Sequence, residues 1–330
     1  MDRPWGRPHP AVAAARAAVR ATLAECDPGD LVLVACSGGA DSTALADAAR
    51  VEREPAGVRT GAVVVDHGLQ PGSDGVARAV AERMTGLGLD PVEVVAVAVD
   101  ATGTGVEDAA RSARYAALEQ VAGRLGARLV LLGHTLDDQA EQVLLGLARG
   151  SGARSLAGMP PARGRYRRPL LGLSREQTRA ACRAEGLTWW EDPMNADPAH
   201  ARVRARRALA ELEAGLGPGL SAALARSADL LREDADHLDT LAAAASAGVD
   251  GGPWPARALA DLPRAVRTRV WRRLLTGRGA PAGQVSARHV EACERLLTHW
   301  HGQGPVHAPG GLRVTRSADR VSITPTPPVE

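Results

Sequence analysis

Short apolar runs alternate with longer alanine-rich segments over the first half of the chain. The runs have the length and the β-branched content of buried strands: LVLVAC (31–36), GAVVVDH (61–67), VEVVAVAV (92–99) and RLVLLGH (128–134). Segments with helical spacing stand around and between them, at 10–25, 42–53, 74–87, 106–124 and 137–148. This alternation predicts an α/β fold with a doubly wound parallel sheet, which helices cover on both faces.

The pattern changes after residue 148. A glycine- and arginine-rich loop is predicted at 149–171, and SREQTRAACRAEG (174–186) predicts a helix with Ser174 as N-cap and Gln177 completing a capping box. Polar groups that follow parallel strands meet at one edge of the sheet, where ligands bind in such folds.

The helical spacing returns at 199–246 and is interrupted by GLGPGL (215–220). We place a domain boundary there. Residues 1–217 then form the α/β domain, and residues 218–330 form a smaller, mostly helical C-terminal domain that ends in short strand-like pieces.

The composition limits how this protein binds anions. All 40 basic residues are arginine, phenylalanine is absent and the net charge is only +2. Codon usage in a GC-rich genome explains this bias most simply. Contacts to phosphate must therefore come from arginines, backbone amides or a metal, and a nucleic-acid partner requires arginines that are clustered locally.

The cysteines and the N-terminus indicate a cytoplasmic protein. The 4 cysteines are scattered and form no Cys-x-x-Cys pair, as is typical of reduced thiols. The N-terminal segment lacks the apolar core of a signal peptide, and no run approaches the roughly 20 apolar residues of a membrane span.

The stretch ACSGGADSTAL joins the first predicted strand to a helix. Gly38 and Gly39 let the backbone approach a ligand, amides at the helix start are free to bind an anion, and serine hydroxyls flank them. Neither the Walker A pattern nor the G-x-G-x-x-G spacing is present. Asp41 fits a phosphate loop if Mg²⁺ binds carboxylate and phosphate oxygens together. The alternative is a turn in which Asp41 or Ser42 caps the helix.

Acidic residues crowd the end of the fourth predicted strand. His134, Asp137, Asp138 and Glu141 fall at this strand end and in the first turn of the next helix. Any one acid there is explained by the helix dipole. Several together repel one another unless a cation lies among them, so the group predicts a metal ion or an ammonium substrate.

The loop resembles the Ser-Gly-Gly-x-Asp-Ser signature of the PP-loop ATP pyrophosphatases. The resemblance implies that the loop holds the pyrophosphate part of ATP while a substrate oxygen attacks the α-phosphate. The implied ATP site contains Ser37, Gly38, Gly39, Ala40, Asp41, Ser42 and His67, with Mg²⁺ at Asp41. His67 follows the second strand, and from its position alone it either faces the nucleotide or caps the turn.

Further motifs resemble one family within this group, the tRNA(Ile)-lysidine synthases. The segment HTLDDQAEQ, followed by RGSG and GM, is similar to the family pattern HHxDDQxET…RGSG…GLxGM, with Thr135 and Gln142 as departures. VEDAARSARY and DPMNADPAHARVRAR are similar to two more family elements, and they supply Glu107, Arg111, Arg114, Tyr115, Asp192, Pro193, Asn195, Arg202 and Arg206.

The resemblance implies roles for these residues. Asp138, Glu141 and Arg111 would bind free L-lysine. Asp41, Asp137 and His134 would serve catalysis through magnesium or proton transfer. Arg149, Arg202 and Arg206 would contact tRNA.

The implied reaction has two steps. ATP adenylates the wobble cytidine in the CAU anticodon of tRNA(Ile) and releases diphosphate, and then the ε-amine of lysine displaces AMP to form lysidine. A tRNA thiolase of the same fold is the nearest rival, and an amidotransferase-type synthetase is less favoured because no glutaminase region can be placed. A nucleotide-binding sensor without turnover is a rival from another class. The sequence is also compatible with a homodimer.

Overall fold

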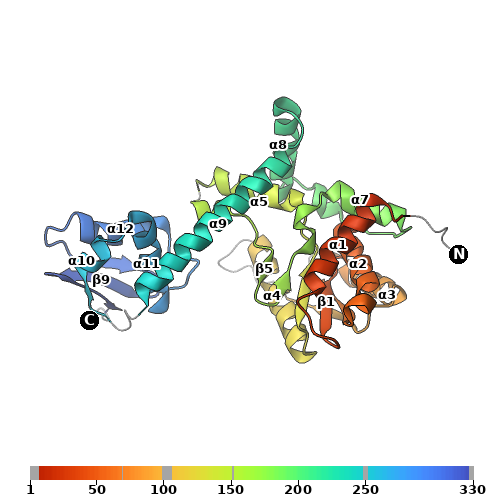
Figure 1. Cartoon of the computed structure of the whole chain (residues 1–330), viewed down its shortest axis with the longest axis horizontal. Coiled ribbons are helices and arrows are strands. Elements are labelled where there is room, and N and C mark those ends of the chain that lie inside the picture. Colours follow the sequence, from red (N-terminus) through yellow and green to blue (C-terminus); the bar gives the residue numbers. More distant parts are fainter. Residues whose placement is uncertain (1–6, 69, 99–105, 151, 248–251, 327–330) are drawn as a thin grey trace. The chain divides into compact units, whose positions relative to one another are not determined.

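The computed structural model of the protein describes residues 7–68, 70–98, 106–150, 152–247 and 252–326 (Figure 1). Contacts divide the chain into two compact units, Met1–Leu230 and Leu231–Glu330. The division falls within the long helix α9 (Leu220–Ser246). The GLGPGL interruption separates α9 from α8 (Ala201–Leu216).

A six-stranded sheet with the order β3-β2-β1-β4-β6-β5 organises the first unit. Its strands are β1 (Leu31–Ala35), β2 (Arg59–Asp66), β3 (Val92–Ala96), β4 (Leu129–Leu132), β5 (Ala162–Arg163) and β6 (Tyr166–Arg167). All neighbouring pairs are parallel except β5 and β6, which form an antiparallel edge. We did not expect this edge within 149–171, because two-residue strands are too short to show an alternating pattern.

Both faces of the sheet are covered, as predicted. Val32 and Val34 of β1 belong to a core shared with α1 (Pro10–Leu23), α2 (Ala40–Ala56) and α3 (Ser73–Gly86). Leu31 and Leu33 point the other way, into a core shared with α4 (Val106–Arg124). Because successive side chains of a strand alternate between faces, a strand covered on both faces is apolar throughout. The predicted fold class is confirmed.

The order of the strands reverses between β1 and β4, and this reversal determines where the site lies. β1 and β4 pair in parallel with Ala35 opposite Leu132, so the segments that follow them emerge side by side. A ligand crevice forms at this kind of switch point. The segment after β1 enters α2, and the segment after β4 enters α5 (Leu136–Ala148).

Helix α7 (Arg175–Ala184) completes the elements at this end of the sheet, and it packs against both α1 and α2. The predicted capping box is present, with the Ser174 hydroxyl accepting from the Gln177 amide at 3.2 Å. The remaining short elements of the first unit are α6 (Ala153–Leu156) and two 3₁₀ turns, Pro169–Gly172 and Pro193–Ala196.

The second unit has a separate core beneath a four-stranded antiparallel sheet, in the order β7-β10-β9-β8. Its elements are β7 (Trp254–Pro255), α10 (Ala256–Ala260), α11 (Arg264–Gly277), α12 (Ala287–Thr298), β8 (Val306–Ala308), β9 (Leu312–Ser317) and β10 (Arg320–Pro325). Trp254 and Trp271 are buried in this core, and the guanidinium of Arg316 stacks on Trp300. Buried Glu294 accepts from both Arg267 and the Trp271 indole.

Within the described residues, no helix has both the length and the apolar character needed to cross a bilayer.

Candidate active site

The phosphate loop (residues 37–42) begins just after β1. Gly38 has φ of +84°, and an added Cβ there would lie 2.5 Å from Val80 Cγ2, so both the turn and the packing require glycine. Gly39 is the N-cap of α2 and makes no side-chain cap. The first-turn amides of α2 therefore lack the side-chain partner that usually caps a helix, which leaves them suited to bind an anion.

Hydroxyl groups hold the loop in shape. The Ser37 amide donates to Ser42 Oγ at 3.2 Å, and Ser42 Oγ donates to the Gly39 carbonyl at 3.0 Å. Because Gly39 is the N-cap, the alternative in which Asp41 or Ser42 caps the helix is wrong.

Asp41 points from the first turn of α2 toward α7. Its Oδ1 accepts a short hydrogen bond from the Thr178 hydroxyl, and its Oδ2 lies 3.8 Å from Arg175 Nε. Burial raises the pKa of Asp41, and Thr178 and Arg175 offset part of that rise. The side chain is still 25% exposed, so its carboxylate can reach a ligand at the loop.

The predicted acids of α5 differ in their surroundings. Asp138 completes a capping box, because its Oδ2 accepts from the Thr135 amide at 2.7 Å and from the Thr135 hydroxyl at 3.0 Å. Asp137 Oδ2 accepts from the backbone amide of Arg175 at 2.7 Å, at the start of α7. Glu141 is only 2% exposed.

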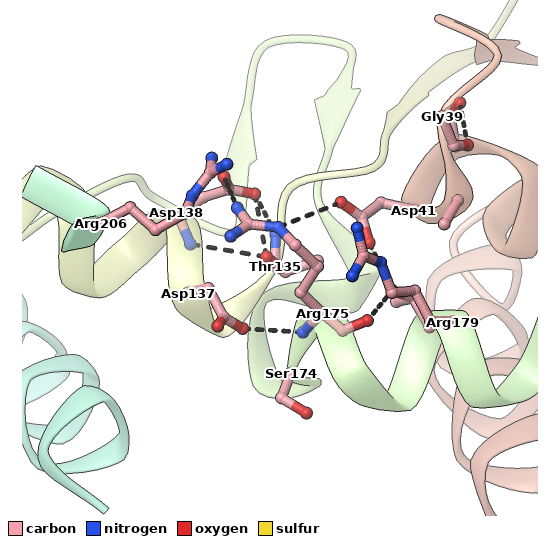
Figure 2. A network of polar contacts seen from close by, with 12 residues as sticks. Gly39, Asp41, Thr135, Asp137, Asp138, Ser174, Arg175, Arg179 and Arg206 are labelled. Atoms are coloured by element: carbon pink, nitrogen blue, oxygen red, sulfur yellow. Dashed lines mark hydrogen bonds and ion pairs between the residues drawn. The ribbon is translucent and has the colours of Figure 1, made fainter. Parts of the chain in front are cut away.

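Arg175 links these acids, and sequence reasoning missed it. Its Nη2 donates to Asp138 Oδ1 at 2.9 Å, and both Nη atoms lie 3.3 Å from Glu141 Oε1. Figure 2 shows the side chain between Asp41 of the phosphate loop and Asp138 of α5. No sequence pattern indicates that the first residue of α7 reaches this site. Only the tertiary fold brings α7 and α5 together.

Arg206, which we expected to contact tRNA, contacts one of the acids that Arg175 contacts, Glu141. From α8 its Nε donates to Glu141 Oε1 at 2.8 Å. Glu141 Oε2 is buried and has no hydrogen-bond partner in the described part of the chain.

The pKa of Asp138 reflects the same network. Burial raises this pKa, but Arg175 and the hydrogen bonds from the Thr135 amide and hydroxyl lower it by more, so the pKa of the carboxyl lies below its ordinary range.

His134 lies beside Asp138 in an environment that keeps it neutral. Burial lowers the pKa of His134 to about 3, with Arg168, Arg114 and Arg111 contributing. Its Nδ1 is buried without a partner among the described residues. Nδ1 of the neutral His134 ring is therefore available for a hydrogen bond with a ligand at this site.

Asp66, rather than His67, holds the turn that follows β2. Its Oδ1 accepts from the Gly68 amide at 2.9 Å. His67 Nδ1 is buried without a partner among the described residues, and burial, followed by Arg114, lowers the pKa of the ring.

Two arginines of α4 pack against the ring of Tyr115, and a third arginine contacts its hydroxyl. The guanidiniums of Arg111 and Arg114 lie 5.2 Å and 5.8 Å from the centre of the Tyr115 ring. Arg168 is buried and donates to the Tyr115 hydroxyl at 3.1 Å. Burial lowers the pKa of Arg111 and Arg114, and the neighbouring positive charges lower it further.

The other predicted positions are placed as follows. Arg149 is exposed at the end of α5, and Arg202 lies in the first turn of α8. Asp192 caps a 3₁₀ turn through the Met194 amide at 2.9 Å. The side chains of Glu107 and Asn195 lie outside the described residues.

Two protein-family models match separate parts of the chain. A model described as a PP-loop domain matches residues 14–213, and one described as a TilS substrate binding domain matches residues 255–322.

Curated relatives match almost the whole chain. A tRNA(Ile)-lysidine synthase of Streptomyces coelicolor is 52% identical and covers 96% of this chain and 99% of its own. The corresponding protein of Thermobifida fusca is 52% identical (96% and 98% covered), and that of Salinispora tropica is 54% identical (95% and 96% covered).

A solved structure shares the fold. The U34-tRNA thiolase NcsA from Methanococcus maripaludis, described with its [4Fe-4S] cluster, superposes with a TM-score of 0.55. The match covers 67% of this chain and 80% of the thiolase at 18% identity.

Proposed function

We propose, because the chain belongs to the tRNA(Ile)-lysidine synthase family, that the residues at the ends of β1 and β4 join free L-lysine to an ATP-activated cytidine of tRNA(Ile). Members of this family form lysidine, so the chain is an ATP-dependent ligase of tRNA. One observation carries the proposal for this site. The phosphate loop and the acids of α5 emerge side by side and are bridged by Arg175.

The phosphate loop supplies the site for ATP. Its helix-start amides would face the pyrophosphate group of bound ATP, and Ser37 provides a hydroxyl near them, while the Ser42 hydroxyl donates to the Gly39 carbonyl and holds the loop in shape. Donors fixed in place before the reaction stabilise the charge that develops on the leaving diphosphate. His67 is proposed to meet the nucleotide from the end of β2.

Asp41 is proposed to hold Mg²⁺. It is a partly buried carboxylate at the phosphate loop, and hard oxygen donors of this kind suit Mg²⁺. Among the described residues no three His, Cys, Asp or Glu side chains form a ready metal cage. Mg²⁺ commonly takes its remaining ligands from phosphate and water, and when bound it would neutralise charge on the phosphates.

Asp138 and Glu141 are proposed to receive the ammonium end of lysine. Glu141 Oε2 is a buried acceptor with no partner among the described residues, and such a group is costly unless a donor reaches it. Arg111 is proposed to meet the carboxylate of the amino acid.

The amine must lose a proton before it attacks. Asp137 and His134 are the groups proposed to assist this step. A general base is most effective when its pKa lies near the working pH, and the pKa of His134 is about 3 in this structure. The bound substrates therefore have to change the surroundings of the ring before it can act as a base.

Arg149, Arg202 and Arg206 are proposed to contact tRNA phosphates, although the contact of Arg206 with Glu141 gives it a second role at the acids.

A homodimer is a further proposal. Leu212 and Leu216, one turn apart on α8, are 41% and 74% exposed, and light scattering of the purified protein would measure its oligomeric state.

The deciding assay incubates the protein with Mg²⁺, ATP, radiolabelled lysine and tRNA(Ile) that carries a CAU anticodon. We expect label on the tRNA together with AMP and diphosphate. An Asp41→Asn variant should lose the product. The proposed function is wrong if the protein binds ATP and this tRNA but attaches no lysine, and replacing lysine with sulfide tests the thiolase alternative directly.

A further inference from the structure

Arg175 occupies the place where the acidic group needs a cation. Its guanidinium lies between carboxylates of two segments, with Nε 3.8 Å from Asp41 Oδ2 and Nη2 2.9 Å from Asp138 Oδ1. The side chain is 18% exposed, so these contacts are shielded from water more than a surface pair would be. The acids raise the pKa of Arg175 above its ordinary value although burial opposes this, so the group stays charged.

The network nevertheless leaves one acceptor without a donor. Arg175 and Arg206 both donate hydrogen bonds to Glu141 Oε1. The other carboxylate oxygen, Oε2, has no partner in the described chain, although Glu141 is only 2% exposed. A buried carboxylate oxygen without a donor is destabilising. The acids can therefore bind a further cation, or exchange Arg175 for one that satisfies both oxygens of Glu141.

We infer that Arg175 is a resident counter-ion that competes with the incoming cations and thereby couples the nucleotide site to the lysine site. This inference rests on the proposed function. A Mg²⁺ ion at Asp41 would repel the guanidinium and weaken its hold on Asp138 and Glu141, which then become available to the ammonium group. Such coupling is reciprocal, so bound lysine also favours Mg²⁺ and nucleotide.

Arginine suits this place for a chemical reason. The site is proposed to activate an amine toward an adenylated base, and a lysine side chain fixed there could itself react. A guanidinium does not lose its proton in proteins and is not a nucleophile, so it can neutralise the acids without reacting.

Replacing the side chain should leave the local fold intact. The Arg175 backbone amide that anchors Asp137, and the Ser174 capping box, do not depend on the guanidinium. Arg175→Gln is therefore the main variant, and Arg175→Lys keeps the positive charge. Arg183→Gln is the matched control, because it makes the same change on the same helix at a side chain that pairs with Glu176 instead.

The experiment measures lysine binding by calorimetry, with and without Mg²⁺ and an ATP analogue whose α and β phosphates are joined by methylene. In the wild type and Arg183→Gln we expect the nucleotide to tighten lysine binding about tenfold, within the usual range of such coupling. Arg175→Gln should bind lysine tightly without nucleotide and show almost no further gain, while Arg175→Lys retains the gain. The inference is wrong if Arg175→Gln keeps the full tenfold gain, or if it binds lysine more weakly under both conditions.

A second measurement separates this inference from the proposed function. Mn²⁺ binding, followed by the loss of its free-ion paramagnetic signal, requires neither lysine nor tRNA. Arg175→Gln should bind Mn²⁺ several-fold more tightly than the wild type, because a competing cation has been removed. If the wild type forms no lysidine, the proposed function fails while this comparison still decides whether Arg175 competes. If lysidine forms but Mn²⁺ affinity is unchanged or lower in Arg175→Gln, only the counter-ion role fails.

Discussion

Burial and neighbouring arginines hold the His134 ring in its neutral form, and this can be observed at the level of a single residue. Because its pKa lies at about 3, the ring should remain unprotonated at every pH at which the enzyme works. We expect its carbon-bound proton signals in NMR spectra to stay constant from about pH 8 to about pH 5, a range in which an ordinary imidazole titrates. Free histidine in the same tube provides the reference, and the signal lost in His134→Gln identifies the residue. A midpoint near the ordinary value of about 6.5 would contradict this.

The same shift has a consequence for stability. The imidazole of the unfolded chain takes up a proton below about pH 6.5, whereas the folded ring resists protonation down to about pH 3. The unfolded state thus binds more protons in this window, and His134 destabilises the fold progressively as the pH falls through it. In urea unfolding, His134→Gln should lose less stability than the wild type between neutral pH and about pH 5. An equal or larger loss in the variant would contradict the assignment.

At this scale the sequence identified which acids come together but not what neutralises them. Asp41 and Asp138 could be paired in advance, because both follow strands of one parallel sheet and such strand ends meet at one edge. The contact of Arg175 with these acids could not be predicted, since it depends on how α7 packs. The second role of Asp138, as the partner of the N-cap Thr135 in the capping box of α5, depends on a departure from the family pattern, because Thr135 supplies a hydroxyl where the pattern has histidine.

At the scale of elements, the chain passes close to the phosphate-loop helix at Gly133, directly after β4. An added Cβ would lie 3.1 Å from the Ser42 amide nitrogen and 3.2 Å from Ser42 Cα, both of which are backbone atoms. Gly133→Ala should therefore shift the first turn of α2 by a few tenths of an ångström. We expect nucleotide affinity to fall about tenfold, because amide geometry at the pyrophosphate sets that affinity.

Gly123→Ala is the matched control for this change. Gly123 lies within α4, and an added Cβ there meets nothing within 4 Å. Alanine has the higher helix propensity, so this variant should be as stable as the wild type or more so, by up to about 1 kcal/mol. Calorimetric titration of both variants with the uncleavable nucleotide checks the pair. Equal affinity in Gly133→Ala and Gly123→Ala would show that the contact tolerates a methyl group.

The helices and strands were predictable where the hydrophobic pattern extends over enough residues to identify its period. The four parallel strands and the helices between them lie within a few residues of the segments that predicted them. Burial on both faces demands continuous apolar sequence in β1 and β4, whereas β3 at the edge of the sheet is only partly buried. The β5–β6 edge escaped notice. Its exposed and half-exposed residues follow no hydrophobic pattern, and its pairing depends on β4 being present.

At the scale of the whole molecule, a net charge of +2 gives no general attraction to nucleic acid, so tRNA binding must rely on local arginines. Each arginine that neutralises a phosphate releases a counter-ion. The logarithm of the binding constant should therefore fall with the logarithm of the salt concentration by about 0.7 to 0.9 for each such contact. We expect a steep salt dependence for tRNA(Ile) and a shallower one for lysine.

Single substitutions test which arginines contribute to that slope. Arg149→Gln and Arg202→Gln should each weaken binding of tRNA(Ile) and reduce the slope by about one unit, as expected for the loss of one phosphate contact. Arg78→Gln is the control, because this exposed arginine of α3 pairs with Asp74 one turn away. Filter-binding titrations at several salt concentrations give both quantities. A variant that loses affinity while keeping the wild-type slope would assign its arginine to a contact other than phosphate, since only the release of counter-ions changes the slope.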